Sequence, residues 1–102
     1  MMKTFEDIKF KQHKSGKGIH GRLTIENGMS LSVVAGQFFY SEPRSDVAPN
    51  GYSRFEIAIF NKDGEWATQE VLGEVGDEVL GWQSRNEINS IIKEMYDYEK
   101  SN

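Results

Sequence analysis

The sequence predicts an α+β fold: a twisted antiparallel sheet of four to five strands with one C-terminal helix packed on one face. Segments of alternating apolar and polar residues are separated by short turns rich in Asn, Asp and Gly, which is the pattern of β-hairpins. The last part of the chain instead spaces its apolar residues three and four apart, which is the pattern of an amphipathic helix. With 102 residues, the chain has the size of one domain, residues 1–102.

The first half of the chain predicts three strands. Residues 8–13 alternate weakly and predict a short first strand, which the Gly-containing turn of residues 14–18 ends. Residues 19–26 and 29–35 alternate strictly, so each of these strands places its apolar side chains on a single face. The apolar sets of the two strands match, and we expect them to form a hairpin.

The loop of this hairpin follows from its register. Asn27 and Gly28 mark the turn, but a two-residue turn would set Glu26 opposite Met29 and mix polar with apolar side chains. A three-residue loop, residues 26–28 with Gly28 as a left-handed bulge residue, keeps the apolar side chains together. We therefore predict the three-residue loop. The pairs that it implies are Ile25–Met29, Leu23–Leu31 and Gly21–Val33.

Three consecutive aromatic residues follow the third strand. If Gly36 introduces no bulge, the strand continues, and Phe39 points into the core while Phe38 and Tyr40 point to the opposite face. One helix covers one face of a sheet, so Phe38 and Tyr40 either lie under a second small core or a second subunit, or form an exposed patch. Exposed aromatic patches mark interaction sites. A long polar connection, residues 41–51, comes next.

The following segment predicts a second hairpin. Residues 52–60 form a strand with Phe55 inward, residues 61–64 a turn, and residues 65–72 the partner strand. The predicted pairs are Ile59–Trp66 and Ile57–Thr68. Residues 73–82 contain three glycines and are expected to cross the molecule, with Val75, Val79, Leu80 and Trp82 as apolar anchors.

The predicted helix covers residues 85 to about 99. Ser84 and Glu87 have the spacing of a capping box, in which each side chain accepts a hydrogen bond from the other residue's backbone N–H. The apolar residues that follow form a stripe about 100° wide, which we expect to pack on the sheet. They are Ile88, Ile91, Ile92, Met95 and Tyr96.

The formal net charge of −4 divides unequally along the chain. Residues 1–51 carry seven Lys and Arg against five Asp and Glu, and residues 52–102 carry five against eleven. The basic N-terminal arm, residues 1–22, is an interaction surface or a set of solvated lysines, and the acidic half imitates nucleic-acid phosphates or serves solubility. Without cysteine, an apolar leader or a membrane-spanning run, the chain is expected to be a cytoplasmic protein with no membrane contact.

Candidate binding residues gather around the long connection. They are Phe38, Tyr40, Glu42, Arg44, Tyr52 and Arg54. An arginine near aromatic rings suits an anionic or nucleotide-like ligand, whereas a solvated loop would bind none. His13 and His20 stand in no metal-binding or catalytic motif, so we expect no metal, no cofactor and no enzymatic activity.

Several motifs follow one another in order: ENGMSLSVVAG, an aromatic loop, FEIAIFNKDGE, DEVLGW and a short helix. From about Leu23 to Met95 this order resembles a group of small, mostly uncharacterised proteins of tailed bacteriophages. The chain departs from the group in its longer, more polar connection at residues 41–51 and in its basic arm. The resemblance implies a phage accessory protein made in the cytoplasm of the infected bacterium. Such proteins often inhibit a host protein or sequester a signal nucleotide.

Three hypotheses about function follow. The first is a non-enzymatic phage protein, a homodimer, that binds and inhibits a host protein, such as one of anti-phage defence. The second is a sponge in which Tyr40, Arg44, Tyr52 and Arg54 hold a nucleotide-type defence signal. The third is weak nucleic-acid binding through residues 9–22, against which the net acidic charge argues.

Overall fold

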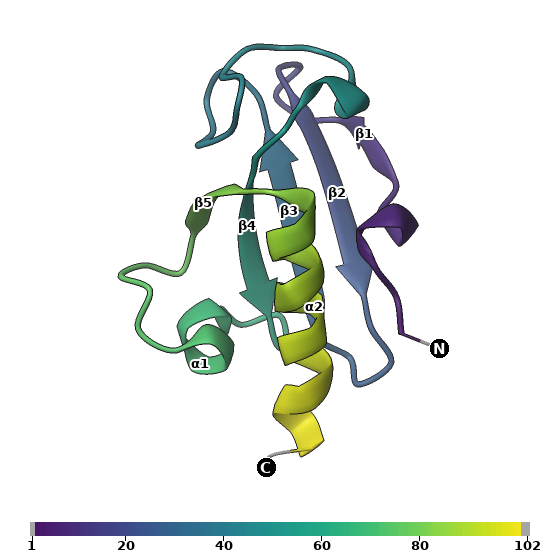
Figure 1. The fold of residues 1–102 in the computed structure, drawn as a ribbon, viewed down its shortest axis with the longest axis vertical. Coiled ribbons are helices and arrows are strands. Elements are labelled where there is room, and N and C mark those ends of the chain that lie inside the picture. The colour runs from purple at the N-terminus through teal and green to yellow at the C-terminus, as the bar shows by residue number, and fades with distance from the viewer. Residues whose placement is uncertain (1, 101–102) are drawn as a thin grey trace.

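A computed structural model describes the backbone of residues 2–100 and the side chains of residues 2–98. It confirms the α+β fold: five antiparallel strands in the order β1-β2-β3-β4-β5, with the C-terminal helix across one face (Figure 1). The strands are β1 (Phe10–Gln12), β2 (Ile19–Thr24), β3 (Ser30–Ala35), β4 (Phe55–Phe60) and β5 (Leu80–Gln83). The helices are η1 (Phe5–Asp7), η2 (Pro49–Gly51), α1 (Thr68–Leu72) and α2 (Arg85–Lys100), of which η1 and η2 are single 3₁₀ turns.

The hairpin of β2 and β3 has the predicted register. The pairs Leu23–Leu31 and Gly21–Val33 are both present. The N–H of Ile25 donates to the carbonyl of Met29 over 2.9 Å, which closes the three-residue loop. Gly28 has φ 93°, a conformation that favours glycine. The prediction is therefore confirmed, and the burial of one face decided the register.

The start of α2 is also as predicted. The N–H of Ser84 donates to the Glu87 carboxylate over 2.9 Å, and the N–H of Glu87 donates to the Ser84 hydroxyl over 3.2 Å. Both halves of the capping box are thus formed. The predicted stripe faces the sheet, and its buried members are Ile88, Ile91, Ile92 and Met95.

Phe55 lies at the centre of an aromatic core between the sheet and the N-terminal segment. It is 0% exposed, and its ring centroid lies 5.2 Å from that of Phe5, 5.8 Å from Phe10 and 6.0 Å from Tyr52. Phe5 comes from η1 and Phe10 from β1, so the basic arm of residues 1–22 contributes to the core. In its described part, the arm is not a separate extension.

The N-terminal segment is also fastened to α2. The backbone N–H of Lys3 donates to the Tyr96 hydroxyl over 2.9 Å, and that of Phe5 donates to the Asn89 side-chain carbonyl over 2.8 Å. The beginning and the end of the described chain therefore pack together beside the sheet.

The aromatic residues after β3 do not continue the strand, and the prediction that Phe39 joins the core is wrong. β3 ends at Ala35, and Gly36 has φ 149°. The buried Ser41 hydroxyl accepts a hydrogen bond from the N–H of Gly36 over 3.0 Å. The hydroxyl oxygen also lies 3.2 Å from the carbonyl oxygen of Gly36. These contacts close a turn, and Phe39 lies half-buried against the ring of His13.

Residues 65–72 do not form a strand either. A single bridge joins Phe60 to Trp66, and the chain then enters α1 at Thr68. The Thr68 hydroxyl accepts a hydrogen bond from the N–H of Ile59 over 2.8 Å and donates one to the backbone carbonyl of Glu78 over 2.6 Å. A side-chain oxygen thus takes the place of a strand carbonyl beside β4. The two predicted strand pairs are wrong for this reason.

The strand beside β4 is instead β5, which overlaps the end of the segment predicted to cross the molecule. Gln83 pairs with Phe55 and Leu80 with Ile57, with an irregularity between the two pairs. β5 is thus one edge of the sheet and β1 the other (Figure 1). Because α2 covers one face, the second face presents the outward side chains of β1 to β4, and we call it the open face.

Candidate functional site

Two half-exposed aromatic rings pack against each other, tilted by 36°, at the β5 edge. The ring centroids of Tyr40 and Trp82 lie 4.9 Å apart, and the side chains are 49% and 48% exposed. The N–H of Trp82 donates to the carbonyl of Tyr40 over 2.9 Å, and the Arg44 guanidinium lies 5.4 Å from the Tyr40 ring centroid. Phe38, in the same turn as Tyr40, is 65% exposed. We call Phe38, Tyr40, Arg44 and Trp82 the edge patch.

Trp82 has an unusual backbone conformation. Within residues 2–100 it is the one non-glycine residue with a positive φ, 55°, which costs a residue with a side chain about 1–2 kcal/mol. The neighbouring Gly81 permits the contact between the Tyr40 and Trp82 rings, because a Cβ at residue 81 would lie 2.5 Å from the Cβ of Tyr40. Backbone strain of this kind is concentrated at functional sites. The edge patch is therefore the strongest candidate site.

Arg54 supports the edge patch from behind. Its guanidinium donates to the carbonyl of Trp82 over 3.0 Å and lies 3.3 Å from the Glu87 carboxylate at the start of α2. The Glu42 carboxylate, in the long connection, lies 3.9 Å from it. Two carboxylates thus balance the charge of Arg54. Its role is to hold the Trp82 backbone and not to offer a free positive charge to an anion.

Tyr52, a predicted ligand contact, belongs to the core. It is 1% exposed, and its hydroxyl donates to the carbonyl of Ser45 over 2.5 Å and accepts the N–H of Val47 over 3.2 Å. These bonds hold the connection of residues 41–51 against the sheet. No part of Tyr52 is left for a ligand to contact.

The structure brings most of the predicted interface residues together around a residue that sequence reasoning missed. Those that meet at Trp82, directly or through one neighbour, are Tyr40, Glu42, Arg44 and Arg54. Phe38 lies in the adjoining turn and packs no core. Trp82 itself was expected to anchor a crossing segment. The sequence signal that could have found it is the Gly-Trp pair, since a glycine in a strand often marks a bulge.

We expect acid to weaken the contribution of Glu87 to stability. The hydrogen bonds from the N–H and hydroxyl of Ser84, and then Arg54, hold the pKa of Glu87 below its ordinary value of 4.5. A carboxylate with a lowered pKa stabilises the fold above that ordinary value and stops doing so as the pH falls through the lowered pKa. Urea denaturation at neutral pH and at about pH 3 should therefore show the stability gap between wild type and Glu87→Gln narrowing in acid.

The control for this prediction is Glu94→Gln, which removes an exposed carboxylate elsewhere on α2. Its stability difference from the wild type should be the same at both pH values. A gap for Glu87→Gln that stays constant or widens in acid would contradict the assigned bonds.

A second surface, on the open face, gathers positive charge. A hollow of about 460 Å³ lies over β1, β2 and β3, and its charged or titratable lining residues are Lys11, His13, Lys14, His20 and Arg22. Burial, and next the adjacent imidazole and cationic groups, lower the pKa of His20 below its ordinary value of 6.5. The described lining includes no carboxylate.

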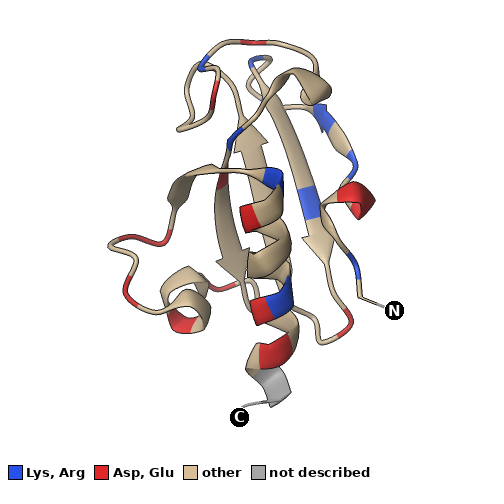
Figure 2. Cartoon of the chain, in the orientation of Figure 1, with Lys and Arg blue, Asp and Glu red and all other residues tan. Residues whose placement is uncertain are grey.

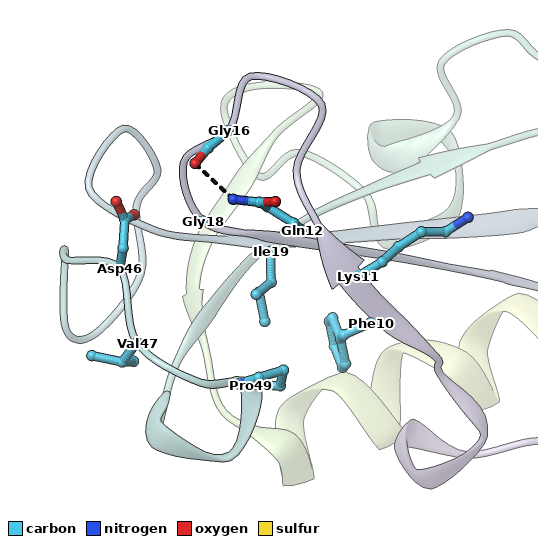
Figure 3. A pocket seen from close by; sticks show the side chains of 9 residues that line it. All are labelled: Phe10, Lys11, Gln12, Gly16, Gly18, Ile19, Asp46, Val47 and Pro49. Carbon is cyan, nitrogen blue, oxygen red and sulfur yellow. Dashed lines mark hydrogen bonds between the residues drawn. The ribbon is translucent and has the colours of Figure 1, made fainter.

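A third hollow, of about 440 Å³, separates the end of the β1–β2 hairpin from the long connection (Figure 3). Phe10, Ile19 and Pro49 face it, and the side-chain amide of Gln12 is already bonded to the carbonyl of Gly16 over 3.0 Å. This lining does not bring together polar groups that would orient a small ligand.

In the described part of the chain, no group of three or more His, Cys, Asp and Glu side chains could hold a metal ion, and no helix is long and apolar enough to cross a membrane. Comparisons with protein-family models, with curated proteins and with solved structures gave no match. Inferences about function therefore depend on the geometry of the edge patch and the open face.

Proposed function

We propose that this chain is a non-enzymatic accessory protein of a tailed bacteriophage that binds and inhibits a host protein of anti-phage defence. The observation that carries the binding role is the pair of half-exposed rings of Tyr40 and Trp82 in contact with each other, with Trp82 held at φ 55°. The phage context derives from the order of the sequence motifs. The proposed place of action is the cytoplasm of the infected cell.

The chemistry of the edge patch suits a protein partner. Tryptophan, tyrosine and arginine carry most of the binding energy at protein interfaces, and Trp82, Tyr40 and Arg44 lie side by side here. The backbone of Trp82 is already fixed by hydrogen bonds from Arg54 and to Tyr40. A partner that binds the patch therefore loses little free energy in ordering it.

The nucleotide sponge receives less support from the same residues. Of the four side chains proposed to hold the nucleotide, Tyr52 is buried and Arg54 is balanced by Glu42 and Glu87. Arg44 and Tyr40 remain, and one cation beside one ring does not surround a small ligand.

The same patch is the proposed contact of a homodimer, which the host protein would separate when it binds one copy. In a twofold dimer each copy would bury the edge patch of the other, including Phe38. Sedimentation velocity over a range of concentrations should give a dimer for the wild type and a monomer for Trp82→Ala. A wild type that sediments as a monomer throughout removes the dimer from the proposal and leaves the patch free for the host protein.

The test of the main proposal is capture followed by inhibition. Bacterial lysate is passed over the immobilised wild type, over Tyr40→Ala/Trp82→Ala, and over Trp66→Ala, which removes the other exposed tryptophan. A specific partner should be retained by the wild type and by Trp66→Ala but not by the double variant. The purified partner should then lose its activity at a one-to-one ratio with the wild type.

Two outcomes would contradict the proposal. One is a captured protein that the double variant retains equally well, since the edge patch would then not be the contact surface. The other is a calorimetric signal with cyclic nucleotides that Arg44→Gln abolishes, which would favour the sponge.

A further inference from the structure

We propose that the open face of the sheet binds single-stranded nucleic acid, with Arg22 at its centre and aromatic rings at both ends. This function is independent of the edge patch, which lies at β5, whereas the open face extends over β1 to β4. The proposal depends on the charge of the face, the position of its rings and the small side chains between them.

The charge of the open face favours an anion. The hollow over β1 to β3 carries Lys11, Lys14 and Arg22, with His13 and His20 between them. Five of the seven basic residues of the first half fall within residues 9–22, on or beside β1, β2 and the turn between them (Figure 2). Most acidic residues of the second half lie on α1, on α2 and in the connection to β5. The net charge of −4 therefore does not describe this face.

Aromatic rings lie at both ends of the face. At one end Phe39 contacts the ring of His13, with centroids 5.1 Å apart, and His13 lies 6.2 Å from His20. At the other end the rings of Phe60 and Trp66 lie 4.8 Å apart, and Trp66 is 55% exposed. Each end thus offers a ring on which a base can stack.

Arg22 and small residues occupy the space between these ends. The Arg22 guanidinium lies 4.9 Å from the ring centroid of Phe60 and donates to the Ser30 hydroxyl over 3.0 Å. Ser32 and Ala58, which pair across β3 and β4, form the floor beside it. The bulky groups at the two ends therefore border a low, cationic centre.

The spacing of the two ends fits more than one nucleotide. His20 lies four residues before Thr24 on β2, and Thr24, Ser30 and Phe60 share a row across the sheet. Four residues of a strand extend about 13 Å. Antiparallel sheets that bind single strands stack two or three bases over their exposed faces. An acidic peptide would use the cations but would have no need of rings at both ends, so the arrangement favours nucleic acid.

The binding test uses a short oligodeoxyuridylate and an oligouridylate of equal length, which differ only in the sugar. In the Trp82→Phe protein, Trp66 is the one remaining tryptophan, and a base that stacks on it should quench its fluorescence. Neutralising three phosphates with Lys11, Lys14 and Arg22 should give a plot of log affinity against log salt with a slope of about −2. The oligonucleotide that binds more tightly identifies the preferred sugar.

Acidification should strengthen this binding. Protonating His20 adds a positive charge beside Lys11, His13, Lys14 and Arg22, which phosphates then balance. Because burial lowers the pKa of His20, the affinity should rise as the pH falls below 6.5. The acidic residue in the same cross-strand row as His20 is Glu56, two strands away on β4. Its carboxylate accepts a hydrogen bond from the N–H of Tyr40 over 3.0 Å. The His20→Gln variant should have a smaller pH dependence and keep the salt dependence.

Matched variants decide whether the face or general charge is responsible. Trp66→Ala should weaken binding of a labelled oligonucleotide by about tenfold, the effect of losing one stacked base. Arg22→Gln should reduce the salt slope by about 0.7. Trp82→Ala and Lys93→Gln, which remove a tryptophan and a lysine away from the open face, should leave binding unchanged.

The proposal is overturned if neither oligonucleotide binds, or if Trp66→Ala and Arg22→Gln bind as tightly as the wild type. It is also overturned if polyglutamate of equal charge binds as tightly as the oligonucleotides, because the face would then recognise charge alone. Circular dichroism of each variant establishes that it is folded before binding is measured. Loss of oligonucleotide binding in Trp66→Ala with capture of the host protein retained would separate this function from that of the edge patch.

Discussion

Replacing Phe55 by Ala is expected to destabilise the protein by about 3–5 kcal/mol, the usual cost of removing a fully buried phenylalanine ring. Phe55 is 0% exposed, and the rings of Phe5, Phe10 and Tyr52 surround it. These rings come from three different segments, so they cannot easily close the cavity together. Since small domains have a total stability of about 5–15 kcal/mol, a large part of it depends on this residue.

Urea denaturation followed by circular dichroism measures this effect. Phe38→Ala is the matched control, because it removes the same ring from a side chain that is 65% exposed. The control should stay within about 0.5 kcal/mol of the wild type, as surface substitutions usually do. A Phe55→Ala protein that loses no more stability than Phe38→Ala would show that the aromatic core is not packed as described.

The second large effect concerns Trp82, where stability and binding should change in different ways. We expect Trp82→Ala and Trp82→Gly both to lose binding of the host protein by about thirtyfold or more, as the loss of a central interface tryptophan usually does. We also expect the Trp82→Gly protein to be more stable than the Trp82→Ala protein. Glycine adopts φ 55° without the cost of about 1–2 kcal/mol that a Cβ incurs.

This order is the reverse of the usual one, since glycine within a strand is less stable than alanine by about 0.5–1 kcal/mol. Thermal denaturation of the two variants side by side is sufficient to detect the reversal. The comparison position is Val34, on the interior strand β3, where Val34→Ala should be more stable than Val34→Gly. If alanine is the more stable substitute at Trp82 as well, the backbone there is not strained, and the argument that strain marks the site fails.

The parts of the fold that the sequence predicted correctly depend on contacts between neighbours along the chain. The loop at Gly28 follows from the face on which Ile25 and Met29 must lie, and the cap of α2 follows from Ser84 and Glu87, three residues apart. In each case the residues that decide the structure lie within one turn of chain. A pattern in the sequence is enough to identify them.

The wrong predictions all involve a partner that is distant along the chain or a side chain that replaces a backbone group. Thr68 ends the pairing with β4 because its hydroxyl binds the N–H of Ile59, and β5 then occupies the edge. The alternation of residues 65–72 does not indicate that the Thr68 side chain replaces a strand carbonyl or that β5 pairs with β4 in their place. Gly36 likewise leaves the strand because Ser41 binds it, and so the position of Phe39 could not be inferred from alternation alone.

The candidate site was predicted in part for a related reason. Tyr40, Arg44 and Arg54 were identified because they are polar or aromatic residues around a long connection, which the sequence displays directly. Trp82, to which they are connected, is 28 residues beyond Arg54, and only the sheet topology brings it near. The same topology buries Tyr52, whose neighbours in the sequence suggested an exposed position.

The bonds from Lys3 to Tyr96 and from Phe5 to Asn89 also determine the order in which the protein can assemble. They join residues 93 and 84 positions apart, so the N-terminal segment finds these partners only after α2 has been synthesised. Until then Phe5 and Phe55 lack a complete hydrophobic environment. A nascent chain of this protein therefore depends on α2 to complete the packing of η1, and the folding rate should reflect these long-range contacts.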